Sequence, residues 1–153
     1  MDKIFERIKN GEKTVIIGIG NRLRTDDGAG SIIVEKLKEK IKKENIIFID
    51  AEIKIENYIG IIKKISPSFI LIIDTIDFGS FPGDFKIFKI EDLKDTTIST
   101  HNLSIPLLKK LINDKEILLF GIQPKNLNFG EGLSLEVKNS IEKIIKYFED
   151  SLI

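Results

Sequence analysis

A chain of 153 residues is long enough to bury a hydrophobic core, and we expect one domain over residues 1–153. Its 24 lysine and arginine residues balance 24 aspartate and glutamate residues, so net charge gives no attraction to nucleic acid or to an anionic membrane. The chain contains no cysteine, which excludes disulfides, iron–sulfur clusters and a thiol nucleophile.

The N-terminal residues mix charges where a signal peptide needs an apolar run, and no apolar stretch reaches membrane-spanning length. We therefore expect a soluble, cytoplasmic protein. Apolar periodicity predicts strands that alternate with helices. In chain order these are a strand at Thr14–Ile19, a helix at 27–43, a strand at Ile46–Ile49, a helix at Tyr58–Ile65, strands at Phe69–Ile73 and Asp84–Ile90, a helix at Leu103–Ile112, a strand at Ile117–Ile122 and a helix at Ser134–Phe148.

This alternation predicts an α/β fold of three layers, with a twisted, mostly parallel sheet of about five strands and helices on both faces. Phe69–Ile73 is the most apolar stretch and is expected to be a central strand. Asp84–Ile90 alternates apolar and polar residues, which predicts an edge strand. In open α/β sheets, ligands bind beyond the carboxyl ends of the strands, where the strand order reverses. Three polar features fall at such ends: the loop 18–30, Asp74 and the loop that contains His101.

The first loop contains two adjacent aspartates at the predicted start of a helix. Gly18 and Gly20 resemble the start of a dinucleotide-binding motif, but Leu23 stands where the third glycine belongs, and two acids would repel a phosphate. Carboxylates there suit cation binding or proton abstraction. Glycines 28 and 30 are expected to let another chain or an ion approach closely. The alternative is that Asp26 and Asp27 are a helix cap and a surface charge.

Asp74 follows a buried strand and therefore needs a partner, which is either a ligand or a loop amide. Asp77 precedes Phe78-Gly79 and is expected to be a turn residue. His101 is the only histidine, which excludes a two-histidine zinc protease site. Two carboxylates and one imidazole form a mixed oxygen and nitrogen set that suits a borderline divalent ion.

The ordered motifs resemble those of the hydrogenase maturation proteases, and are similar to the formate-hydrogenlyase (hydrogenase 3) branch. The resemblance covers roughly residues 14 to 148. The motifs that carry it are Gly18-Ile19-Gly20-Asn21, Leu23-Arg24, Asp26-Asp27-Gly28-Ala29-Gly30, Leu71-Ile72-Ile73-Asp74-Thr75, Pro82-Gly83, Thr100-His101-Asn102 and Gly121-Ile122-Gln123-Pro124. One departure stands after the second strand, where relatives usually carry an acid and two glycines and this chain has Asp50-Ala51-Glu52. The loop is therefore expected to be stiffer and more acidic.

The resemblance implies an endopeptidase, of a family classed as aspartic-type, that removes the C-terminal extension of a nickel–iron hydrogenase large-subunit precursor. It implies that Asp27, Asp74 and His101 bind nickel that the substrate supplies, with Asp27 and Asp74 also as catalytic candidates. No resident organic cofactor is expected, the precursor is the expected partner, and the protein is expected to be a monomer.

Two chemical routes follow. The nickel acts as a Lewis acid, or an aspartate acts as general base while backbone amides of the glycine-rich turn, helped by Asn21, stabilise the oxyanion. Two other functions stay open at this point. One is a nickel-sensing chaperone that docks on the precursor without cutting it, and the other is a methyltransferase that uses Gly18–Gly20 and Asp50.

Overall fold

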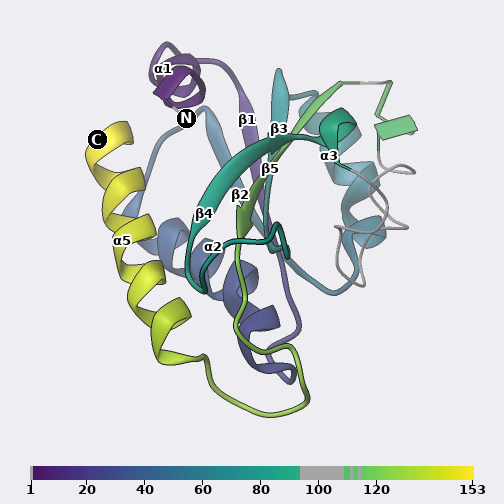
Figure 1. Ribbon diagram of the computed structural model, residues 1–153. Coiled ribbons are helices and arrows are strands. Elements are labelled where there is room, and N and C mark those ends of the chain that lie inside the picture. Colours follow the sequence, from purple (N-terminus) through teal and green to yellow (C-terminus); the bar gives the residue numbers. More distant parts are fainter. Residues whose placement is uncertain (1, 94–108, 111, 114) are drawn as a thin grey trace.

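A computed structural model of the chain describes residues 2–93, 109–110, 112–113 and 115–153. In chain order the elements are α1 (Asp2–Lys9), β1 (Thr14–Ile19), the 3₁₀ turn η1 (Thr25–Gly28), α2 (Ala29–Lys40), β2 (Ile46–Glu52), η2 (Ile55–Tyr58), α3 (Ile59–Ile65), β3 (Phe69–Thr75), β4 (Phe85–Lys89), η3 (Ile90–Asp92), β5 (Glu116–Ile122) and α5 (Leu135–Leu152). Figure 1 shows these elements as one layered arrangement around a twisted sheet.

The sheet has five strands in the order β2-β1-β3-β5-β4. The pairs β1–β2, β1–β3 and β3–β5 are parallel, whereas β4 runs antiparallel to β5. All six residues of β1 and all seven of β3 are buried, which explains their continuous apolar sequence, because a central parallel strand is covered on both faces. The predicted fold class is confirmed, and so is the edge position of the strand around 85–89.

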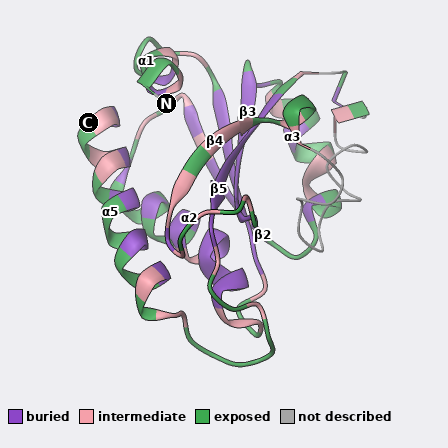
Figure 2. Cartoon of the chain, viewed as in Figure 1, coloured by how far each residue is buried: buried purple, intermediate pink, exposed green. Residues whose placement is uncertain are grey.

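Helices cover both faces of the sheet, and each face has its own apolar core. Helices α1, α2 and α5 pack on one face, where Phe69, Leu71 and Ile73 of β3 join their buried side chains. Helix α3 covers the other face, where Ile70 and Ile72 of β3 lie. The purple buried residues in Figure 2 therefore run along the inner strands and the inner sides of the helices, whereas the edge strand β4 is pink and green. Consecutive residues of β3 thus point to opposite layers, as a strand requires.

Several element boundaries differ from the predicted ones. The helix expected from residue 27 to 43 begins at Ala29 and ends at Lys40, where Ile41 turns to an extended conformation. The second strand continues through Asp50 to Glu52. An N-terminal helix, α1, was not predicted; it buries Phe5 and Ile8 although its composition is strongly charged. Most of the helix predicted at Leu103–Ile112 lies outside the described residues.

The connections place a topological switch point between β1 and β3. The chain leaves β1 through α2 on one face to reach β2, and leaves β2 through α3 on the other face to reach β3. Because the two connections diverge there, the carboxyl ends of these strands are the place where open α/β sheets bind ligands. Within the part of the chain that is described, no helix is long and apolar enough to cross a membrane.

Candidate active site

Asp27 lies at the switch point and is buried, with 3% of its surface exposed. It belongs to η1, the first element after β1 along the chain. Its Oδ1 accepts a hydrogen bond from the Thr75 hydroxyl at 3.2 Å, and its Oδ2 accepts one from the Asn21 amide at 3.3 Å. The alternative that this residue is a surface charge is therefore wrong.

Asp74 is the penultimate residue of β3 and only 1% exposed. Its Oδ1 accepts a hydrogen bond from the backbone amide of Thr75 at 2.8 Å. Of the two partners that the sequence left open, a ligand or a loop amide, the structure shows a backbone amide, but this amide belongs to the strand and not to a loop. Thr75 thus contacts both acids, and the structure brings Asp27 and Asp74 to one place at the carboxyl end of the sheet.

His101 lies outside the described residues. Within residues 2–93, 109–110, 112–113 and 115–153, no three side chains of a type that binds metal form a group. The convergence of His101 with Asp27 and Asp74, and the nickel site that these residues would form, therefore remain predictions.

Asp26 has a different role from the helix cap that its position suggested. The cap position of α2 is Gly28, and no side chain caps this helix. Instead Asp26 is fully buried, and its Oδ2 accepts hydrogen bonds from the amides of Lys125 and Asn126 at 2.9 and 3.1 Å. Ser134 donates its amide to Oδ1 at 2.7 Å and its hydroxyl to Oδ2 at 2.8 Å. Asp26 therefore ties the loop after β1 to the loop after β5 and to the start of α5.

The glycines of the first loop allow the chain to approach itself and not a ligand. A Cβ atom on Gly30 would lie 2.3 Å from the carbonyl oxygens of both Ile19 and Ile73. A Cβ atom on Gly28 would lie 2.9 Å from Cα of Arg22. The space that was expected for an ion or another chain is therefore filled by the protein's own backbone, and Gly30 lets the start of α2 sit directly on the ends of β1 and β3.

Three amides of the first loop donate hydrogen bonds within the protein. The amide of Gly20 donates to the Glu52 carbonyl at 2.7 Å, and that of Asn21 donates to Asp27. The amide of Leu23 donates to Oδ1 of Asn21 at 2.9 Å. These three donors have partners within the protein, which counts against them as oxyanion donors, and the oxyanion role of the glycine-rich turn remains a prediction.

Asp50, near the end of β2, belongs to a polar cluster with Ser31 and Arg22. Its Oδ1 accepts a hydrogen bond from Ser31 at 2.8 Å, and Nη2 of Arg22 lies 3.7 Å from its Oδ2. Arg22 also donates to Ser31 at 3.1 Å and pairs with Glu35. This carboxylate is thus occupied by internal partners, which counts against its use as a ribose ligand in a methyltransferase.

Glu52 follows this cluster and adopts a positive φ of 51°. The left-handed region is costly for a residue with a side chain, and glycine adopts it freely. This is the position at which the related sequences usually have the second glycine of their motif. The loop therefore keeps the backbone conformation that a glycine would allow, although the residue is acidic.

Gln123 organises the loop after β3, a role that sequence reasoning missed. Its Oε1 accepts hydrogen bonds from the amides of Phe78 and Ser80 at 2.9 and 3.2 Å, and its Nε2 donates to Asp77 at 3.0 Å. Asp77 also accepts from the Gly79 amide at 3.1 Å, which confirms its predicted place in a turn. These bonds, from Gln123 first and then Gly79, lower the pKa of Asp77.

Two surface hollows lie at opposite ends of the sheet. One borders the acid site and is lined by Gly20, Asn21, Arg22, Leu23, Glu52 and Ile53. Leu23 and Ile53 are exposed apolar residues, at 61% and 49%.

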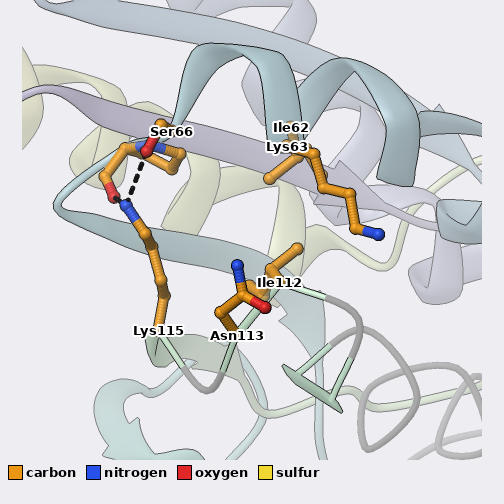
Figure 3. Close-up of a pocket in the computed structure, with 7 residues that line it drawn as sticks. Ile62, Lys63, Ser66, Ile112, Asn113 and Lys115 are labelled. Atoms are coloured by element: carbon orange, nitrogen blue, oxygen red, sulfur yellow. Dashed lines mark hydrogen bonds between the residues drawn. The ribbon is translucent and has the colours of Figure 1, made fainter.

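The other hollow, drawn in Figure 3, is lined by Ile62, Lys63, Ser66, Pro67, Ile112, Asn113 and Lys115. There Lys115 reaches across to Ser66 and donates to its hydroxyl at 2.9 Å. Ser66 and Pro67 precede β3, and Lys115 precedes β5. This second hollow is therefore at the amino ends of the strands, away from the acids.

Comparison with known proteins identifies the family. The family model described as hydrogenase maturation protease (HycI) matches residues 32–151. A protein of Methanocaldococcus jannaschii assigned to the hydrogenase maturation proteases is 37% identical over 155 residues, which cover 94% of this chain and 90% of the relative. The hydrogenase 3 maturation protease of Escherichia coli K12 is 30% identical over 138 residues, or 88% of each chain.

A solved structure agrees with these sequence matches. The crystal structure of a [NiFe] hydrogenase maturation protease, HycI, from Thermococcus kodakarensis KOD1 superposes with a TM-score of 0.82 at 28% identity. The match covers 97% of this chain and 98% of that one. The resemblance inferred from the motifs is confirmed: this chain belongs to the hydrogenase maturation protease family.

Proposed function

We propose that this protein is an endopeptidase that removes the C-terminal extension of a nickel–iron hydrogenase large-subunit precursor after nickel has been inserted. The observation that carries the proposal is the pair of buried aspartates, Asp27 and Asp74, which Thr75 joins at the switch point of the sheet. A member of this family needs a site that meets the substrate beyond the ends of the strands, and these acids stand there.

In this proposal the nickel is part of the substrate. The precursor presents a bound nickel with open positions, and Asp27, Asp74 and His101 complete its ligand shell. Carboxylate and imidazole groups are suitable ligands for such an ion, but two carboxylates and one imidazole hold it less tightly than a site rich in imidazole or thiolate. The protease then cuts only precursor that carries metal, because the metal is part of the surface that it recognises.

The position of the hollow beside the acids supports access by a peptide. Gly20 and Asn21 line it, and the Asn21 amide donates to Asp27, so the Asn21 backbone lies between a chain in the hollow and the acid. Water attack on the scissile bond has two routes, with the nickel as Lewis acid or with Asp27 or Asp74 as general base. In the second route the oxyanion needs donors other than the amides of Gly20, Asn21 and Leu23, because these already have partners.

The proposal is tested by incubating the protein with precursor prepared with and without nickel, and detecting the released peptide by mass spectrometry. We expect cleavage of the nickel-loaded precursor alone, and none by Asp27→Asn. Binding of the loaded precursor without peptide release would favour the chaperone alternative instead. Equal cleavage of the metal-free precursor would contradict recognition of nickel and leave the peptidase activity standing.

A further inference from the structure

We propose that Thr75 is a positioning residue that fixes the two acids relative to each other, an inference that rests on the proposed function. Thr75 donates a hydrogen bond to each carboxylate: its hydroxyl donates to Asp27 at 3.2 Å and its amide donates to Asp74 at 2.8 Å.

The alternation of strand β3 explains why a residue of this kind is needed. Ile73 faces the layer of α2 and α5, whereas Ile72 and Ile76 face the layer of α3. By the same alternation Thr75 belongs to the first layer and Asp74 to the second. The Thr75 hydroxyl therefore donates to Asp27 of η1, at the start of α2. Its amide donates to Asp74, which belongs to the opposite layer.

Thr75 is also well placed to hold a fixed position. It pairs with Ile122 of β5 in a regular parallel register and is only 1% exposed. Asp27, in contrast, is on a 3₁₀ turn between β1 and α2, where the loop conformation alone fixes the side chain less firmly than a strand would. The hydrogen bond to Thr75 fixes the position of Asp27 relative to the sheet. The Asn21 amide donates to the second carboxylate oxygen at 3.3 Å.

Loss of the hydroxyl should reduce the chemical step more than substrate binding. Catalytic groups must be held close to their working geometry, and a hydrogen bond to a carboxylate is among the stronger ones. Valine has nearly the same shape as threonine but cannot donate. We expect Thr75→Val to lower kcat about 10- to 100-fold, with KM within about threefold of the wild-type value.

Thr75→Ser is the conservative variant that keeps the donor and removes a buried methyl group. We expect it to retain kcat within about threefold while its Tm falls by roughly 2–4 °C, because a methyl-sized cavity destabilises a domain of this size by that amount. If Thr75 had a merely structural role, kcat of each variant would instead fall in proportion to the fall in its Tm. Thr14→Val is the matched control, because Thr14 is equally buried and donates its hydroxyl to the Glu12 carbonyl at 3.0 Å at the far end of β1.

The experiment measures kcat, KM and Tm for the wild type and these three variants on the nickel-loaded precursor. Low kcat for Thr75→Val, with near wild-type kcat for Thr75→Ser and Thr14→Val, would support the inference. A wild-type kcat for Thr75→Val would overturn it and leave the proposed function intact. If kcat of Thr75→Ser fell together with its Tm instead of staying near the wild-type value, that result would also overturn the inference. A wild-type protein that releases no peptide would overturn the proposed function and this inference together.

Discussion

Replacing Asp26 by asparagine is expected to destabilise the protein, because four donors converge on this buried carboxylate. Oδ2 accepts three of them, from the amides of Lys125 and Asn126 and from the Ser134 hydroxyl, and Oδ1 accepts the Ser134 amide. Asparagine offers one oxygen and one amino group. If its oxygen takes the place of Oδ2, its amino group meets the Ser134 amide, and two donors face each other.

The magnitude follows from these contacts. One hydrogen bond to a charged acceptor is lost, at about 1.5–3 kcal/mol, and a buried donor is left without a partner, at about 1–3 kcal/mol. The free energy of unfolding should therefore fall by roughly 3–5 kcal/mol. For a domain of this length each kcal/mol corresponds to about 2–4 °C, so we expect Tm to fall by about 6–20 °C.

Thermal unfolding followed by circular dichroism measures this change, with Ser134→Ala as the comparison. That variant keeps the Ser134 amide bond to Asp26 and loses the hydroxyl bond together with the weak cap at Val137, whose amide is 3.4 Å from the Ser134 hydroxyl. It should cost about 1.5–3 kcal/mol, less than Asp26→Asn, because it does not set two buried donors against each other. A Tm for Asp26→Asn within about 2 °C of the wild type would refute the reasoning, because it would show that these bonds contribute nothing to the fold.

The remaining predictions concern the site, the loop after β2, the effect of pH and the metal. Asp27→Ala and His101→Ala should each abolish release of the peptide in the precursor assay; cleavage at the wild-type rate by either would remove that residue from the site. Glu52→Gly should raise the free energy of unfolding by up to about 1 kcal/mol, since glycine adopts the positive φ of 51° without strain; a Tm more than about 3 °C below wild type would contradict this. The lowered pKa of Asp77 means that its contribution to stability is complete above the unfolded value of about 3.8 and is lost as pH falls through the lower folded value. Tm should thus fall more steeply below pH 4 in the wild type than in Asp77→Asn, and parallel curves would show that the shift is absent. Purified protein should contain no stoichiometric nickel or zinc after dialysis against a chelator, as measured by elemental analysis, and activity should depend on metal loaded into the precursor. Retained metal with cleavage of metal-free precursor would make the protein an ordinary metalloprotease.

The sequence by itself determined the layered α/β architecture, the central position of the strand at Phe69–Ile73 and the edge position of β4. These features follow from local periodicity, because a strand covered on both faces is continuously apolar and an edge strand alternates. The same reasoning placed Asp27 and Asp74 at neighbouring strand ends. Helix α1 was missed because its strongly charged sequence hides the two residues, Phe5 and Ile8, that it buries.

Only the tertiary structure decided what each polar residue does. Asp26 and Asp27 are adjacent, and no local pattern separates a residue that meets Ser134, more than a hundred positions away, from one that meets Thr75. Hydrogen bonds between distant segments depend on which loops the completed sheet brings together, and this information is not present in the spacing of one motif. For the same reason the committed amides of the first loop and the role of Gln123 became visible only in the folded chain, where each donor has a definite acceptor.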